Sequence, residues 1–395
     1  MQRRQFLLAS AAAASLPWSG RLFAAPRDSA RMLVVFLRGG YDSNNLLVPH
    51  ASDFYYQARP TLAIARPDAA NPNSAVALDA QWGLNPVMRD ALLPLWQRQQ
   101  LAFVPFAGTD DLSRSHFETQ DDIESGQAGR QRRDYRSGFM ARLSGVLSGV
   151  PAIAFTDSLP LTFQGGGDLP NVSLRGIGKG GLDARQAQIL SQMYDATPLA
   201  AAAREGLALR RQVTAQLREE MEQAGRGAAS ARSFADETRR MASLMRERYR
   251  LGFVDVGGWD THANQGSVEG GLANNLRNLG EGLAAYADAL GPAWKDTVVV
   301  VLSEFGRTFR ENGSKGTDHG HGTAYWVLGG SVRGGRIAGE QVAVAQAQLL
   351  QNRDYPVLTN YRSLFGGVLS RLWGLSPAQL ERVFPGARPC DLGLV

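Results

Sequence analysis

Residues 298–322, VVVVLSEFGRTFRENGSKGTDHGHG, are the stretch from which the fold is most readily predicted. The stretch begins with four valines and a leucine. A run of β-branched residues without charges predicts a strand that is buried on both faces. The apolar run stops just before Glu304, so a carboxylate follows the carboxyl end of the strand. A glycine-rich loop comes next and closes on Asp318, His319 and His321.

A ligand site is expected at this position, because ligands of open α/β sheets bind beyond the carboxyl ends of the strands. Imidazole and carboxylate groups are suitable ligands for a divalent metal ion. We therefore predict that Glu304, Asp318, His319 and His321 contribute to a metal site. A hydrogen-bonded turn is the alternative interpretation, since Asp, His and Gly are ordinary turn residues.

Two other predicted strands end in the same way. Residues 32–37, MLVVFL, run into GGYDSNN, which places Asp42 just beyond the strand. Residues 251–256 run into GGWDTH, which places Asp260 and His262 beyond theirs. Since parallel strands end at one edge of a sheet, we predict that these three side chains join the metal site. Capping of the following turn is the alternative role for Asp42.

A polar segment after the strand predicted at 101–104 supplies candidates for catalysis. Ser113 and Ser115 are candidate nucleophiles, because a nearby metal or base can activate a serine. His116 is grouped with them as a catalytic residue. Arg307, or alternatively Arg38, is the group expected to neutralise an anionic substrate together with the metals. Capping of a helix by one of the two serines is the alternative interpretation.

Strands alternate with helices along the chain, which predicts an α/β fold with a mostly parallel central sheet. Further strands are predicted at 152–155 and 325–328, and helices at 85–96, 135–147, 270–290 and 361–373. Residues 59–82 are rich in Pro, Asn and Ala and predict a surface loop. Residues 182–250 have the pattern of amphipathic helices and predict a helical insertion. Because no linker interrupts the pattern, residues 26–395 are predicted to form a single domain.

The composition is that of an ordinary water-soluble protein, with 44% hydrophobic and 20% charged residues among 395. The net charge of +5 rests on arginine, because the chain has only three lysines. Apart from the short and interrupted segment 130–136, the charges form no dense basic tract, so we predict no nucleic-acid partner. The single cysteine, Cys390, excludes an internal disulfide framework.

The first 25 residues have the features of an export signal. Arg3 and Arg4 precede Phe6 and an alanine-rich apolar run that ends in small residues. This arrangement resembles a twin-arginine signal, which makes the twin-arginine translocation machinery a predicted partner. The apolar run is too short for a stable membrane anchor. We therefore predict a periplasmic or secreted protein whose mature chain begins near Pro26.

Several motifs together resemble a broad bacterial family of exported proteins of undefined function. They are FLRGGYDSNN, RSHFETQD, DVGGWDTHANQ, VVVLSEFGRT and GTDHGHGTAYWVLGG, in addition to the twin-arginine start. That family is generally placed in the alkaline phosphatase-like superfamily, together with sulfatases and phosphodiesterases. The resemblance implies a three-layer α/β/α sandwich and a site for one or two divalent ions, namely Zn, Mg or Ca.

The resemblance also implies roles for individual residues. Asp42 matches the first-strand aspartate of the superfamily, which binds one of the metals. Asp260 matches the aspartate of its D-x-x-x-H pair. Glu304 stands where the superfamily has the aspartate of an Asp-His dipeptide. His319 or His321 resembles its last metal-binding histidine.

The sequence departs from the superfamily pattern at three places. His262 follows Asp260 after two residues, where four are usual. Phe305 replaces the histidine of the Asp-His dipeptide. The segment from Ser113 to His116 resembles the region after the superfamily's nucleophile, but no serine aligns with that nucleophile itself.

Two functions are compatible with these motifs. The first is an exported metal-dependent hydrolase of a phosphate or sulfate ester, acting on an anionic small molecule or polymer through a serine or water nucleophile. The clustering of histidines in the motif loops favours this function. The second is a non-catalytic protein of the same fold that binds a polymer or a partner protein, and the missing Asp-His dipeptide favours it.

Overall fold

An eight-stranded mixed sheet forms the middle layer of the computed structural model, with the strand order β10-β5-β9-β8-β1-β7-β6 and β11 also paired to β5. The structure describes residues 29–127, 134–148, 150–167, 169–173, 189, 192–208 and 234–395. The strands are β1 (Arg31–Leu37), β5 (Leu101–Gly108), β6 (Ala152–Phe155), β7 (Leu251–Val256), β8 (Thr297–Ser303), β9 (Thr323–Leu328), β10 (Arg336–Ile337) and β11 (Thr359–Asn360).

Most neighbouring strands of this sheet run parallel, as predicted. β1 lies between β7 and β8 and is parallel to both. β9 is the exception, because it runs antiparallel to β5 and β8. The connection from β8 to β9 therefore begins and ends at the same edge of the sheet. Glu304 and the Asp318–Gly322 loop consequently lie at one edge, without a helical crossover between them.

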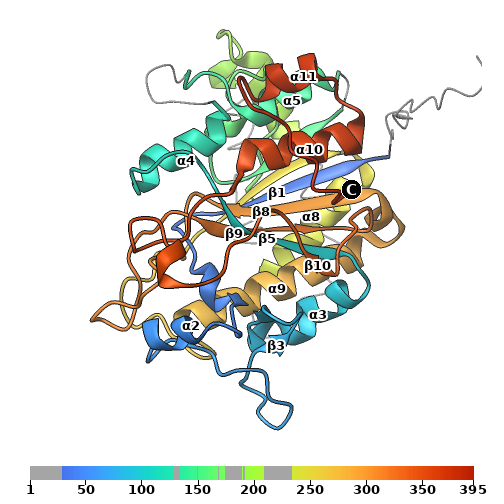
Figure 1. The fold of residues 1–395 in the computed structure, drawn as a ribbon. Helices are drawn as coiled ribbons and strands as arrows, with labels where there is room; N and C mark the ends of the chain where they lie inside the picture. The colour runs from blue at the N-terminus through green and yellow to red at the C-terminus, as the bar shows by residue number, and fades with distance from the viewer. Residues whose placement is uncertain are drawn as a thin grey trace, which may run out of the picture.

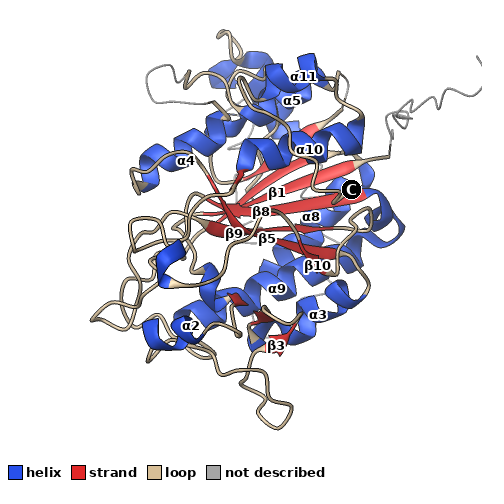
Figure 2. Ribbon diagram, viewed as in Figure 1, coloured by secondary structure: helices blue, strands red, loops and turns tan. Residues whose placement is uncertain are grey.

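Helices cover both faces of the sheet (Figures 1 and 2), which confirms the predicted three-layer α/β/α class. One face carries α3 (Arg89–Gln97), α8 (Phe234–Glu247) and α9 (Gly271–Leu290). The other face carries α4 (His116–Ser125), α5 (Phe139–Val146), α10 (Tyr361–Trp373) and α11 (Pro377–Val383). The short helix α2 (Asp53–Ala58) lies at the lower left of Figure 1.

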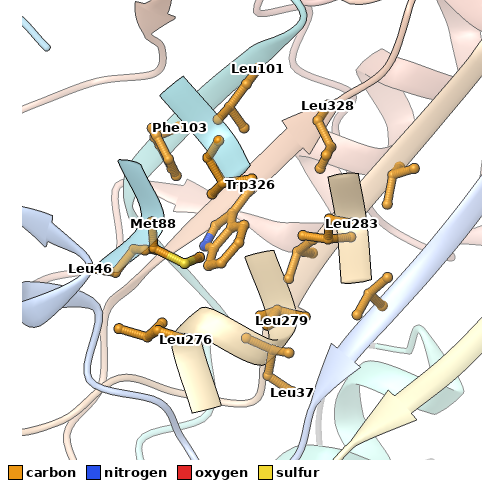
Figure 3. Packing of buried hydrophobic residues seen from close by; sticks show 14 of the residues in the cluster. Leu37, Leu46, Met88, Leu101, Phe103, Leu276, Leu279, Leu283, Trp326 and Leu328 are labelled. Carbon is orange, nitrogen blue, oxygen red and sulfur yellow. The ribbon is translucent and has the colours of Figure 1, made fainter. Parts of the chain in front are cut away.

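Two hydrophobic clusters fill the spaces between the layers. In β8, Val299 and Val301 belong to the cluster on the α9 side, whereas Val298, Val300 and Leu302 belong to the other. The alternation follows from the period of two residues along a strand, and it explains why the strand has no polar face. Figure 3 shows Trp326 of β9 surrounded by apolar side chains from the helices and the sheet, including Met88, Phe103, Leu276 and Leu279.

Local details differ from the sequence prediction. The helix predicted at 85–96 begins with a 3-10 turn, Pro86–Met88, and continues as α3. The predicted loop 59–82 contains β3 (Val76–Ala77), which joins β2 (Leu47–Val48) and β4 (Gly83–Leu84) in a small antiparallel sheet. Such two-residue strands carry no periodic signal, so the sequence pattern does not reveal them.

Parts of two predictions lie outside the described residues. These are the export signal at 1–25 and about half of the helical insertion at 182–250, of which residues 189, 192–208 and 234–250 are described. Among the described residues, no helix has both the length and the apolar character needed to cross a membrane.

A core substitution in α9 tests the packing of this layer. Leu283 is 1% exposed, whereas Glu281 lies on the solvent side of the same helix. Leu283→Ala should lower the free energy of unfolding by about 2–5 kcal/mol, because it leaves a cavity against the sheet. Glu281→Ala should change it by no more than about 0.5 kcal/mol. Urea titration followed by circular dichroism measures both, and equal losses would contradict the layer assignment.

Candidate metal centre

The loops at the carboxyl edge of the sheet bring several of the predicted site residues together. In the register of β1 with its neighbours, Leu37 is paired with both Val256 and Ser303, so β1, β7 and β8 end at the same level. Their following loops contain Asp42, Asp260 and Glu304. The chain then returns into β9 at this edge, on the left of Figure 1.

Asp260 is the centre of the candidate site. Its Oδ1 atom lies 2.9 Å from Nε2 of His262 and 3.2 Å from Nε2 of His319. The two Nε2 atoms are 3.0 Å apart. Ligand atoms about 2.0–2.1 Å from a tetrahedral zinc ion would be separated by ~3.3 Å. The triangle therefore has nearly the dimensions of three ligands around one ion.

His116 adds a fourth nitrogen beside this triangle. Its Nε2 atom lies 3.6 Å from Oδ2 of Asp260. One ligand atom from each of His116, Asp260 and His319 lies within 4.8 Å of the others. The Nε2 atom of His116 is buried and has no hydrogen-bond partner among the residues that the structure describes. Leaving such a group unsatisfied costs about 1–3 kcal/mol, so a partner from outside the chain is expected there.

The Nδ1 atom of each imidazole lies within 3.3 Å of an oxygen acceptor, an arrangement in which Nδ1 carries the proton and Nε2 can bind an ion. Histidines that ligate metals in proteins almost always make such contacts through the other nitrogen. The contacts are His116 Nδ1 with Glu304 Oε1 at 2.8 Å, His262 Nδ1 with Asp318 Oδ1 at 3.3 Å, and His319 Nδ1 with the carbonyl oxygen of Arg114 at 3.0 Å.

Glu304 and Asp318 were both predicted as metal ligands. In the structure each of them instead contacts the Nδ1 atom of a histidine, on the side of the ring away from the site. The Glu304 side chain is completely buried. Its Oε1 also accepts hydrogen bonds from the Gly39 amide at 2.7 Å and from Gln120 at 2.9 Å. Burial raises the pKa of Glu304, but the hydrogen bonds from His116 and Gln120 outweigh this and hold it below its ordinary value. The charged carboxylate therefore orients the imidazole of His116.

Arg307 was predicted to neutralise a substrate, and the structure buries its side chain completely. One of its nitrogens donates to Asp260 Oδ1. This contact lowers the pKa of Asp260, against the opposing effect of burial. The remaining hydrogen bonds of Arg307 go to carbonyl oxygens of the strand-end loops, namely those of Gly39, Gly40, Trp259 and Thr317. Arg307 therefore positions Asp260 and joins three loops.

Phe305 has a packing role that the sequence did not reveal. Its ring centroid lies 4.9 Å from that of His116 and 5.0 Å from that of His319. Gly40 makes room for this ring, because a Cβ atom there would lie 2.5 Å from it. Gly40 also has a φ of +63°, which favours glycine. The phenyl ring thus packs against the imidazoles of His116 and His319 and restricts their orientation.

Asp42 lies outside the triangle, in a buried ion pair. Arg59 Nη1 donates to its Oδ2 at 2.5 Å, and Nη2 to its Oδ1 at 3.0 Å. Gln265 donates to Oδ2 at 2.6 Å, and the Asn44 amide to Oδ1 at 3.2 Å. Asp42 and Arg59 are both 0% exposed. The Asn44 contact is the turn-capping role considered as the alternative, and nothing in the sequence distinguished Arg59 from other loop arginines.

The other predicted residues lie around the triangle. Ser113 donates its hydroxyl proton to Asp111 at 2.9 Å, which is a local contact before α4. Ser115 is the N-cap residue of α4, but its side chain makes no capping hydrogen bond. His321 is buried, and burial together with the charge of Arg114 lowers its pKa to about 4. His321 does not belong to the ligand group found among the described residues.

The candidate ligands are open to solvent. The side chains of Asp260 and His262 are each 46% exposed, that of His319 is 26% exposed and that of His116 is 23% exposed. A structural zinc site is usually closed by four protein ligands, whereas a catalytic site keeps a position for water or substrate. The exposure of these side chains matches the second case.

Comparison with known proteins identifies the family. A family profile described as a protein of unknown function, DUF1501, matches residues 29–384. The chain belongs to the DUF1501 family. No curated protein is similar to it in sequence.

Several solved structures resemble this DUF1501 protein at low identity. One is a protein in the alkaline phosphatase superfamily from Vibrio parahaemolyticus, with 12% identity, a TM-score of 0.38 and coverage of 94% of this chain and 76% of that chain. Another is the lipoteichoic acid synthase LtaP from Listeria monocytogenes, with 8% identity, a TM-score of 0.38 and coverage of 92% and 77%. A third is the soluble domain of lipooligosaccharide phosphoethanolamine transferase A from Neisseria meningitidis, with 11% identity, a TM-score of 0.34 and coverage of 77% and 78%.

Substitution of Arg59 tests the buried ion pair. Arg59→Met should lower the free energy of unfolding by about 3–5 kcal/mol, because it leaves the Asp42 carboxylate buried without a counter-charge. The double variant Asp42→Asn/Arg59→Met removes both charges and should recover part of that loss. Urea titration measures the three proteins. A double variant less stable than Arg59→Met would contradict the pairing.

Proposed function

We propose that this protein is an exported, metal-dependent hydrolase of a phosphate or sulfate ester. The observation that carries the proposal is the convergence of two histidine Nε2 atoms on the exposed carboxylate of Asp260. The motif resemblance to the alkaline phosphatase-like superfamily supports this type of ester. The twin-arginine-like start of the chain supports a periplasmic location, where the substrate is an anionic small molecule or polymer.

Asp260, His262 and His319 would hold the ion. Two imidazoles and one carboxylate suit zinc and neighbouring divalent metals better than Mg²⁺ or Ca²⁺, which prefer oxygen ligands. The unpartnered Nε2 of His116 fits a group bound next to Asp260. When bound, such an ion supplies Lewis-acid stabilisation of the charge on the ester oxygens.

His116 would act as the base. Its Nδ1–H is held by Glu304, and its Nε2 lone pair is free to accept a proton from the attacking group. The Glu304 carboxylate stabilises the imidazolium that forms, and it fixes the ring in the correct tautomer. Packing of Phe305 against the ring maintains this orientation.

The attacking group would be water. Of the two candidate serines, Ser113 already donates its hydroxyl proton to Asp111. The side chain of Ser115 makes no capping hydrogen bond and, within the described part of the chain, no hydrogen bond to a base. A water molecule between His116 and the ester needs neither serine, and its proton passes directly to Nε2.

Removal of the proposed ligands tests the metal centre. His262→Ala and His319→Ala should each abolish stoichiometric metal binding, measured by plasma mass spectrometry of the dialysed protein. His50→Ala is the matched control, because the His50 ring contacts the carbonyl oxygen of Asp79 away from the site. Equal metal content in all three variants would contradict the assignment of the ligands.

Removal of the base tests catalysis. His116→Ala should keep its metal but lose activity by about 10²–10⁴-fold, the usual contribution of a general base. Ser115→Ala should stay within a few-fold of the wild-type rate. The assay uses aryl phosphate monoesters, aryl phosphodiesters and aryl sulfates.

Three outcomes would contradict the proposal. Loss of the metal from His116→Ala would make His116 a fourth ligand and favour the non-catalytic binding protein. Loss of activity in Ser115→Ala would favour a serine nucleophile over water. A metal-loaded wild-type protein that cleaves none of the three ester classes would exclude the hydrolase.

A further inference from the structure

Two of the three carboxylates at the strand ends are unavailable to a metal ion. Asp42 and Glu304 are both 0% exposed, whereas Asp260 is 46% exposed. Both oxygens of Asp42 accept hydrogen bonds from Arg59. In Glu304, Oε1 accepts from His116 and Oε2 from Ser303. Each carboxylate would have to give up buried partners before it could bind a cation.

Arg59 is held firmly in its place beside Asp42. Its Nε donates to the carbonyl oxygen of Phe309 at 2.7 Å, and Nη2 donates to that of Thr308 at 3.0 Å. Nη1 also donates to Asn45 Oδ1 at 3.1 Å. The planar guanidinium thus forms a two-pronged contact with the carboxylate, the strongest geometry for this pair. The positive charge that Asp42 needs is supplied by the chain itself.

The charges around the Asp260 triangle set a second constraint. Asp318 and Glu304 contact histidines of the site, and Arg307 contacts Asp260. Arg353 donates to the carbonyl oxygen of His319. Arg353 and Arg114 are both ion-paired with Asp354. With Asp260 itself, these four carboxylates and three guanidinium groups leave one net negative charge. A divalent ion changes this to one net positive charge.

We propose that this edge of the sheet binds a single divalent ion, with Arg59 in place of a second one, and that the site therefore prefers esters that carry one negative charge. The second part rests on the hydrolase function proposed above. Phosphodiesters and sulfate monoesters carry one charge at neutral pH. Phosphate monoesters carry nearly two, since their second pKa is about 6. A singly charged ester balances the site, whereas a doubly charged one leaves an unbalanced negative charge in it.

The reaction needs no further reactant. The oxygen of water forms a new bond to phosphorus or sulfur, and the ester bond to the leaving alcohol breaks. His116 takes a proton from the water and returns it to the leaving oxygen. The products are an alcohol and a phosphate monoester, or an alcohol and sulfate.

The number of ions is tested by metal analysis and by calorimetric titration of the metal-free protein. We expect one ion per chain in the wild type and in Asp42→Asn, and none in Asp260→Asn. If Asp42→Asn does not fold, Asp42→Asn/Arg59→Met removes both charges and serves the same purpose. Two ions per chain in the wild type, or loss of the ion with the Asp42 substitution, would overturn the inference. A wild type without any ion would instead contradict the proposed metal centre.

The charge preference is tested with bis(4-nitrophenyl) phosphate, 4-nitrophenyl sulfate and 4-nitrophenyl phosphate at pH 8. We expect kcat/KM to be at least about tenfold higher for one of the two singly charged esters than for the doubly charged one. The better of the two identifies the substrate as a phosphodiester or a sulfate. A preference for 4-nitrophenyl phosphate would overturn the inference and leave the hydrolase function intact, whereas inactivity on all three would contradict that function.

Asp318→Asn separates charge from shape within the same site. The amide oxygen of Asn can still accept the hydrogen bond from His262, but one negative charge is removed. The preference for a singly charged ester should then fall by about threefold or more, because the site becomes more positive. An unchanged preference would show that charge does not select the substrate. Metal content, measured in parallel, should remain at one ion per chain.

Discussion

The register of β1 with β7 and β8 is the constraint on which the site depends. All three strands are parallel and end level with one another, at Leu37, Val256 and Ser303. Their loops therefore leave the sheet at the same height, and residues more than two hundred positions apart meet there. Because β9 runs antiparallel to β8, the loop that carries His319 returns to the same edge. A slip of one residue in this register would turn every side chain of the strand to the other face.

Burial gives the three strand-end carboxylates different roles. Asp42 is enclosed and neutralised by Arg59. Glu304 is enclosed as well, and its charge is used to orient His116. Asp260 is the only one of the three that remains exposed, and it is the one on which the imidazoles converge. A buried charge requires a partner, so Asp42 and Glu304 are held by internal contacts, whereas Asp260 stays accessible to an ion from solvent.

Much of the fold follows from local patterns. The valines of β8 alternate between the two cores, as expected for a buried strand. The periodic pattern of residues 270–290 predicted α9 to within one residue. The direction of β9 was beyond such patterns, because the same apolar run pairs in either direction. The two-residue strands and the 3-10 turn before α3 were missed for a different reason, because elements this short show no periodic pattern.

The sequence by itself determined the inventory of the site: strands that end in small residues, followed by Asp260, His262, Glu304 and His319. Only the tertiary structure decided which of these side chains point at the proposed metal position and which contact a neighbouring histidine instead. Glu304 contacts His116 across 188 positions, and a buried arginine from a predicted surface loop neutralises Asp42. Both contacts arise because a charge removed from water takes whichever partner the packing brings near. The residues adjacent in sequence therefore do not reveal which partner each buried charge will have.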